Sequence, residues 1–166
     1  DELGHVNWVL YRLLTLLGNP SPTLRARVIK SIAAIVEADP VLMANENVRK
    51  AIIQRFYDGG ISVRQAAVDL VGRYALLSEP LFDHYFEALD ERLMDKGVSV
   101  RKAVVKILRD ALLAHPNYHN RAKICRKLVH RASAPKEEDS IKDLIHATFQ
   151  RLWFDSAAAA AHPKTA

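Results

Sequence analysis

The sequence predicts an all-α fold, an α-solenoid in which helical hairpins stack one after another. Two stretches, 58–80 and 95–116, carry nearly the same text, "DGGISVRQAAVDLVGRYALLSEP" and "DKGVSVRKAVVKILRDALLAHP", with their first aspartates 37 residues apart. Apolar residues in both recur at steps of three and four, which is the spacing of one helix face. No segment alternates polar and apolar residues as a half-buried strand does. Repeated segments with helical spacing predict structural units that cover each other's apolar faces.

Weaker copies of the same text lie upstream and downstream. The basic residue of the motif recurs with spacings of 39, 37 and 41 residues, at Arg25, Arg64, Arg101 and Lys142. A period near 40 is typical of two-helix HEAT repeats. We therefore predict about four HEAT-type hairpins over residues 1–154. Residues 155–166 are alanine-rich without amphipathic pattern and are predicted to be a low-complexity tail or linker.

The second helix of each hairpin is expected to follow the motif. A hydroxyl residue precedes each basic residue by two positions and is expected to cap the helix; these residues are Thr23, Ser62, Ser99 and Ser140. A proline follows 15 or 16 residues after the basic residue in three copies and is expected to end the helix; these prolines are Pro40, Pro80 and Pro116. In the third copy the apolar face is Val100, Val104, Ile107, Leu108 and Ala111.

The first helix of each hairpin is expected between these second helices. One apolar face steps through Val48, Ile52 and Phe56, and the next runs from Leu81 to Leu93. Gly59-Gly60 and Gly97 are expected to make the tight turns within the hairpins, and "SAPKEED", 133–139, is a polar loop. Trp153 and Phe154 continue the apolar spacing of the last helix, so we expect them in the core or covering a following repeat.

Composition limits the classes of function. The 166 residues are 49% apolar with a net charge of +5, which suits a folded chain with a weak preference for anionic partners. A single cysteine excludes an internal disulfide framework and fits a reducing compartment. No apolar run is long enough to cross a bilayer, so no membrane contact is expected. The chain begins at Asp1 without Met, which predicts a piece of a longer protein.

No group of residues predicts catalysis, a metal or a cofactor. Gly59-Gly60 lacks the further glycine and lysine of a phosphate-binding loop and is interpreted as a turn. His115 and His119 have metal-like spacing, but Pro116 between them breaks the helix that would align both rings. Cys125 has basic neighbours but no histidine–acid pair, which favours a packing role. We therefore predict a protein that is not an enzyme and needs no cofactor.

Basic residues are sorted by helix. In the third copy, Lys102, Lys106 and Arg109 lie opposite the apolar face. The following helix carries no acid and five further basic residues, Arg121, Lys123, Arg126, Lys127 and Arg131, whereas the preceding helix, 81–95, is rich in Asp and Glu. Such clusters either neutralise nucleic-acid phosphates, with salt-sensitive affinity, or form a solvated face that keeps the array soluble. The sequence leaves both interpretations open.

Arg64 and Arg101 each follow an aspartate by six positions, at Asp58 and Asp95. An aspartate in the hairpin turn and an arginine at the start of the second helix can pair between neighbouring repeats. Such a ladder would fix the stacking angle. Contact with nucleic acid is the alternative for both arginines.

Three phrases, "ISVRQAAVDLVGRY", "GVSVRKAVVKILRD" and "FQRLWF", occur in this order and resemble the HEAT array of the large cohesin-loader subunit, the Nipped-B-like (sister chromatid cohesion) family. "LRARVIKSIAAIVEADP" upstream is similar to the preceding repeat of that family, so the resemblance covers roughly residues 22–154. It implies a nuclear, chromatin-associated, hook-shaped solenoid that helps to load the cohesin ring. Members of the family grip double-stranded DNA without base specificity against cohesin's ATPase heads, contact its kleisin and stimulate its ATPase. A smaller loader subunit binds a region absent from this chain.

The resemblance implies a candidate site for DNA or cohesin. The residues that match the motif are Arg64, Arg101, Lys102, Lys106 and Arg109. Charge alone adds the cluster Arg121, Lys123, Arg126, Lys127 and Arg131. The alternative function is a generic HEAT scaffold that takes a peptide or helix in its groove without contacting nucleic acid. In that case, the acidic helix with Glu87 and Glu91 would matter more than the lysines.

Overall fold

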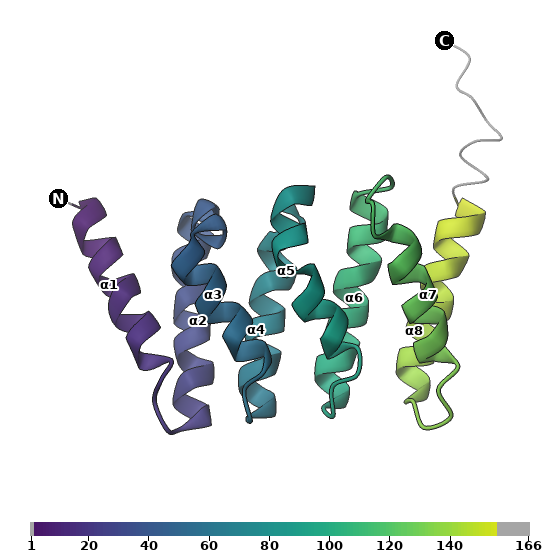
Figure 1. Cartoon of the computed structure of the whole chain (residues 1–166), viewed down its shortest axis with the longest axis horizontal. Coiled ribbons are helices and arrows are strands. Elements are labelled where there is room, and N and C mark those ends of the chain that lie inside the picture. The colour runs from purple at the N-terminus through teal and green to yellow at the C-terminus, as the bar shows by residue number, and fades with distance from the viewer. Residues whose placement is uncertain (1, 156–166) are drawn as a thin grey trace, which may run out of the picture. The chain divides into compact units, whose positions relative to one another are not determined.

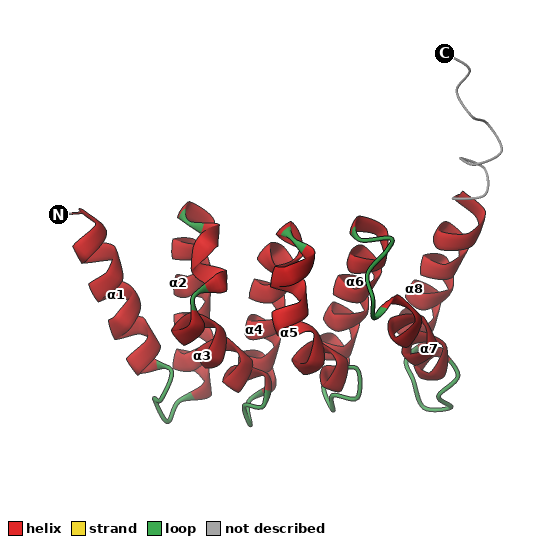
Figure 2. Cartoon of the chain, turned by 45° about the horizontal axis from the view of Figure 1, so that its top comes forward, coloured by secondary structure: helices red, strands yellow, loops and turns green. Residues whose placement is uncertain are grey.

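The computed structural model describes residues 2–155 and consists of helices joined by turns (Figures 1 and 2). The α-helices are α1 (Glu2–Leu16), α2 (Pro22–Ala38), α3 (Glu46–Phe56), α4 (Ile61–Tyr74), α5 (Glu79–Arg92), α6 (Val98–Ala114), α7 (Arg121–Ala132) and α8 (Asp139–Gln150). Short turns of 3₁₀-helix, η1 (Pro40–Ala44) and η2 (Ala75–Leu77), and a π-helical turn, η3 (Arg151–Asp155), complete the elements. The predicted all-α class of HEAT-type hairpins is confirmed, with pairs α1/α2, α3/α4, α5/α6 and α7/α8.

The chain divides into two compact units, residues 1–104 and 105–166, and the division lies within α6. In the first unit, α2 packs against α4 and α3 against α5, so second helices and first helices form two layers (Figure 2). The layers are joined by α3 on α4 and by α1 on α2. In the second unit, α7 packs against α8.

The core of the first unit is made by the apolar faces that the sequence predicts. Its fully buried side chains include Ile29, Ile32, Val36, Val48, Ile52, Phe56, Val63, Val71, Phe82, Tyr85 and Leu89. The buried Tyr85 hydroxyl donates a hydrogen bond to the Met43 carbonyl at 2.7 Å, which satisfies its polar group. Full burial of one such large side chain is worth about 1.5–3 kcal/mol, so these faces determine how the helices stack.

The second unit has its own smaller core. Its buried side chains include Leu108, Ala111, Leu112, Ile124, Leu128, Ile141, Ile145 and Phe149. Trp153 and Phe154 do not belong to it, because they are 60% and 70% exposed, so the prediction of a core position is wrong. The Trp153 ring stacks on Phe149 from outside, with centroids 4.8 Å apart. Whether the two rings cover a following repeat stays a prediction.

The second helices begin earlier than the sequence indicated. The residue before α2 is Ser21, whose hydroxyl accepts from the Leu24 amide at 3.4 Å, and Gly60 precedes α4 without a side-chain cap. Glu138 precedes α8, and α6 starts at Val98. The predicted caps are therefore wrong, because all four residues lie inside the first turn: Thr23, Ser62, Ser99 and Ser140.

The turn glycines are required by close packing, not by backbone conformation. The glycines lie in the tight turns as predicted, and no glycine with positive φ occurs in the described residues. A Cβ atom on Gly60 would lie 2.9 Å from the Cβ of Pro22, and one on Gly97 would lie 2.9 Å from Cγ2 of Ile61. Each glycine thus lets the turn approach its neighbour in the preceding repeat.

The prolines act in two different ways. Pro40 and Pro116 come directly after the ends of α2 and α6, as predicted. Pro80 instead lies in the first turn of α5, where a missing amide hydrogen costs nothing. The prediction that Pro80 ends the preceding helix is therefore wrong.

Candidate nucleic-acid interface

Two arginine–aspartate pairs join successive hairpins of the first unit. Arg25 donates to both carboxylate oxygens of Asp58, from Nε at 2.8 Å and from Nη2 at 2.7 Å. Arg64 binds Asp95 in the same way, at 2.7 Å and 2.8 Å. The side chains of the second pair are only 9% and 1% exposed. The predicted ladder between neighbouring repeats is confirmed for these two pairs.

The motif arginines Arg64 and Arg101 also close their own hairpin turns. Nη1 of Arg64 donates to the Asp58 carbonyl at 2.8 Å, and Nη1 of Arg101 donates to the Asp95 carbonyl at 2.7 Å. The carboxylates in turn accept backbone amides, Gly60 on Asp58 at 2.8 Å and Gly97 on Asp95 at 2.7 Å. Each of these turns is therefore held by side-chain hydrogen bonds, in which the arginine donates to a carbonyl and the aspartate accepts from an amide.

This geometry bears on the predicted DNA or cohesin contact of Arg64 and Arg101. The Arg64 guanidinium donates to Asp95 and to its own turn, and the residue is 8% exposed. Arg101 is half-buried and donates to two carbonyls of the preceding turn. The structure therefore places both residues in the turn framework, and their contact with DNA or cohesin stays a prediction.

The ladder carboxylates have pKa values below those of ordinary aspartates. Burial raises the pKa of Asp95, but hydrogen bonds from Arg64 and from the Gly97 amide outweigh it and lower the pKa below 3.8. Burial is likewise outweighed at Asp58 by the hydrogen bonds from Arg25 and Gly60. A carboxylate that is stabilised only in the folded state contributes stability while it is ionised.

We therefore expect a defined acid dependence of folding. A lowered folded-state pKa adds stability that is fully present above the unfolded pKa near 3.8 and is lost as the pH falls below it. Denaturant titrations should give a constant ladder contribution from neutral pH down to about pH 5 and a falling one below about pH 4. Asp95→Asn should flatten this fall. An equal slope in the variant would show that Asp95 does not carry it.

The predicted stripe on α6 is divided between the two units. Lys102 is half-buried in the first unit, and Lys106 is exposed in the second. Arg109, half-buried, donates from Nε to the neighbouring Asp110 at 2.8 Å. Their contact with DNA or cohesin stays a prediction.

The basic residues of α7 do not form a single exposed group. Arg121 donates to the Leu112 carbonyl at 2.8 Å and so satisfies the end of α6. Arg131 pairs with the buried Glu137 of the 133–139 loop at 2.6 Å. Lys123 and Lys127 are half-buried, and Arg126 is exposed. Arg121 and Arg131 thus have structural partners, while contact of the cluster with DNA or cohesin stays a prediction.

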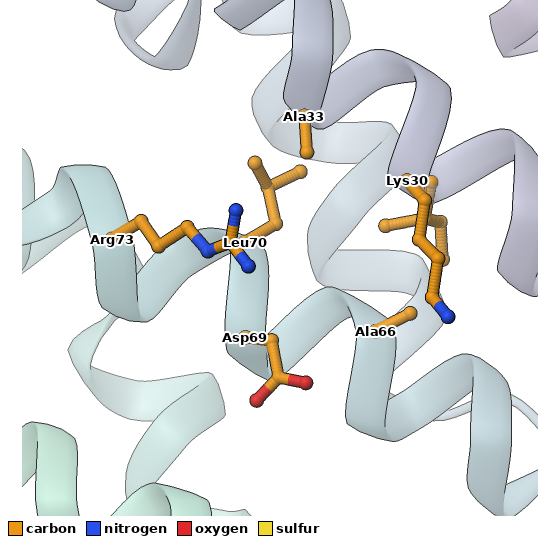
Figure 3. A pocket seen from close by; sticks show the side chains of 7 residues that line it. Lys30, Ala33, Ala66, Asp69, Leu70 and Arg73 are labelled. Atoms are coloured by element: carbon orange, nitrogen blue, oxygen red, sulfur yellow. The ribbon is translucent and has the colours of Figure 1, made fainter. Parts of the chain in front are cut away.

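A groove between α2 and α4 adds residues that the sequence analysis missed. It measures about 340 Å³ and has an apolar floor that includes Ala33, Ala66 and Leu70. Figure 3 shows Lys30 and Arg73 on either side of it. Asp69 lies between them in this view and accepts from Gln65 at 2.8 Å.

The repeat alignment contains the signal for Lys30. Lys30, Asp69 and Lys106 each lie five residues after the motif arginine of their copy. The position therefore faces away from the core in each second helix, and all three residues are exposed. Extending the α6 stripe to equivalent positions would have found Lys30 and the acidic exception Asp69.

Other kinds of site find little support in the described residues. No group of three or more His, Cys, Asp or Glu side chains there could hold a metal ion. None of the helices described here has the length and apolar character needed to span a bilayer. Burial raises the pKa of the Cys125 thiol more than Arg121 lowers it, which suits packing better than nucleophilic chemistry.

Comparison with known proteins places these features in a family. A family model described as a HEAT repeat associated with sister chromatid cohesion matches residues 30–71 and 77–108. Over 87% of its length, the chain is 39% identical to the Nipped-B protein of Drosophila melanogaster and 37% identical to the human Nipped-B-like protein. The chain belongs to the Nipped-B-like family. It is also 25% identical, over 88% of its length, to the sister chromatid cohesion protein mis4 of Schizosaccharomyces pombe.

The chain spans a small part of these Nipped-B-like proteins, 7% of the Drosophila protein, 5% of the human one and 9% of mis4. The segments that match the family model contain Lys30, Asp69 and the Arg64–Asp95 pair. The basic helix α7 lies outside them.

Proposed function

We propose that the chain is a non-catalytic HEAT-repeat scaffold of a cohesin loader, acting in the nucleus on chromatin. Membership of the Nipped-B-like family and the name of the mis4 protein support a role in sister chromatid cohesion. In this role the chain contacts DNA, cohesin or both, promotes loading of cohesin and helps to stimulate cohesin's ATPase. Its proposed partners are the ATPase heads and kleisin of cohesin and double-stranded DNA, while the smaller loader subunit binds elsewhere on the longer protein.

One observation carries the DNA contact, the contrast in charge between the second helices α2 and α4 and the first helix α5 of the first unit. Exposed cations Arg27, Lys30 and Arg73 lie on the second helices α2 and α4. The first helix α5 instead carries Glu79, Asp83, Glu87, Asp90 and Glu91 with a single arginine. Exposed cations on α2 and α4 attract phosphates, and phosphate contacts fix a protein on a duplex without reading its sequence.

Removal of the negative charge of Asp69 is expected to increase DNA affinity, whereas removal of a cation would decrease it. Its carboxylate borders the groove between Lys30 and Arg73, where it opposes the approach of a phosphate (Figure 3). Asp69→Asn is therefore expected to tighten binding to two unrelated duplexes equally, by roughly two- to fivefold at low salt. Fluorescence anisotropy over a salt series measures this, and affinity should fall as salt rises.

The matched control is Asp83→Asn, because Asp83 is an exposed carboxylate of α5 in the other layer. Both variants raise the net charge by one, so only a local contact distinguishes them. Equal effects of the two variants, or binding that ignores salt, would remove the α2–α4 face as the DNA contact.

A further inference from the structure

A second surface of the first unit lies at its hairpin turns, apart from the α2–α4 groove. The turns that join α3 to α4 and α5 to α6 enclose a groove of about 500 Å³. Its walls include the apolar side chains of Tyr57, Ile61 and Met94 and the cations Arg92 and Lys96. These residues all lie in the first unit and share none with the proposed DNA contact.

Apolar side chains are exposed at equivalent turn positions of two successive repeats. Tyr57 and Met94, 51% and 66% exposed, lie 37 residues apart, and so do Ile61 and Val98, 49% and 39% exposed. Single exposed apolar residues are ordinary, but a strip that recurs in register over two repeats is typical of an interaction surface. A partner that covers this strip must span both turns.

The carboxylates that line the groove already have cationic partners. Asp58 and Asp95 line it, but each carboxylate is bound by ladder arginines and a turn amide. Arg92 pairs with Asp95 at 3.3 Å and lies over the Tyr57 ring, 5.0 Å from its centroid. The lining thus holds three cations, Arg64, Arg92 and Lys96, against two paired carboxylates.

The charged residues also differ between the two ends of the groove. Glu91 lies beside Arg92, 3.9 Å away and 55% exposed, so the Arg92 end of the groove is less favourable for an acidic side chain. Lys96 is exposed on the lining and offers an ammonium group to it. An acidic side chain is therefore accommodated beside Lys96, and an apolar one between Tyr57, Ile61 and Met94.

We propose that this groove binds an extended acidic segment of a partner protein with two apolar anchors, one for each turn. Packed helices lie about 8–10 Å apart, and an extended chain of the polyproline II type rises about 3.1 Å per residue and returns every third side chain to the same face. The two anchors are therefore about three residues apart, and a carboxylate next to them pairs with Lys96. The ligand class is an acidic peptide with large apolar residues, not a nucleic acid.

The test uses the 166-residue chain and a fluorescein-labelled peptide of pattern Glu-Phe-Glu-Glu-Leu-Glu. A second peptide carries lysine at every glutamate. The acidic peptide should bind in the micromolar to millimolar range, and Met94→Glu should weaken it about tenfold. Lys96→Glu should weaken the acidic peptide and strengthen the lysine peptide, which a purely structural role of Lys96 would not do.

The control variant is Leu77→Glu, because Leu77 is 63% exposed but lies in η2, at the other end of α4. It should leave peptide binding unchanged, and circular dichroism should show all three variants folded. The proposal is overturned if the acidic peptide does not bind, if both peptides bind equally, or if Leu77→Glu has the effect of Met94→Glu. It is also overturned if the chain self-associates through this groove, seen as a dimer that Met94→Glu dissociates. DNA affinity should be unaffected by Met94→Glu, which separates this proposal from the proposed function.

Discussion

Replacing Asp95 with alanine is expected to destabilise the first unit by about 3–5 kcal/mol, because it leaves a buried arginine without its counter-ion. Arg64 is 8% exposed and donates two hydrogen bonds to this carboxylate. The Gly97 amide loses its acceptor as well. Urea denaturation followed by circular dichroism measures the change, and the midpoint should fall sharply.

Two further variants separate the orphaned charge from the loss of contacts. Arg64→Met with Asp95→Leu removes both charges, so it is expected to recover part of the stability that Asp95→Ala loses. Lys50→Ala breaks the exposed Glu46–Lys50 pair and should leave the midpoint unchanged within error. If the double variant is less stable than Asp95→Ala, the cost does not come from the unpaired guanidinium. If Asp95→Ala does not fold at all, the folded double variant still decides the question.

The repeated sequence predicted the fold well because each copy forms the same helical hairpin with its buried residues at equivalent positions. Val63 and Val100 occupy the same position after each turn and are both buried, so a single pattern located several helices. The ladder was predictable for the same reason, since the motif arginine and the turn aspartate recur together. The buried faces and the ladder both form between one repeat and the next, so a pattern that recurs in the sequence predicts both partners of each contact.

The errors occur where a structural feature depends on one particular contact. The predicted hydroxyl caps are wrong because each second helix already begins one residue before the predicted cap. In the sequence, Arg131 belongs to a basic cluster. Its partner Glu137 comes from a loop, and the sequence does not predict how that loop folds back on the helix. Trp153 followed the apolar spacing but lies outside, because periodicity gives the face of a helix and not what covers it.

The α2–α4 groove of the proposed interface could not be located from the sequence. The sequence indicated a basic stripe on one second helix and a basic cluster on the helix after it, residues 101–131, where several cations have partners within the chain. Lys30 and Arg73 were overlooked because they are separated in sequence and meet only where α2 packs on α4. A groove of this kind is a property of two helices together.

Reversing the charge of Lys30 and Arg73 together, as Lys30→Glu with Arg73→Glu, is therefore expected to give the largest loss of DNA affinity among variants of the first unit. Each charge-assisted contact is worth about 1.5–3 kcal/mol, reduced here by exposure to solvent, so the expected weakening is about ten- to a hundredfold at low salt. The slope of log affinity against log salt should fall by about two, since each lost phosphate contact contributes about 0.9. Unrelated duplexes should be affected equally, because the contact reads phosphates and not bases.

The control must change net charge by the same amount elsewhere. Lys50→Glu with Lys136→Glu lowers the net charge of +5 by the same four units at two exposed positions outside the groove. Lys102→Glu with Lys106→Glu, on α6, shows whether the predicted stripe contributes as well. A local interface predicts a large effect for the groove pair and a small one for the control, with folding unchanged in circular dichroism. Equal weakening by the groove pair and the control would mean that DNA senses only the overall charge, and the α2–α4 face would then have no special part in binding.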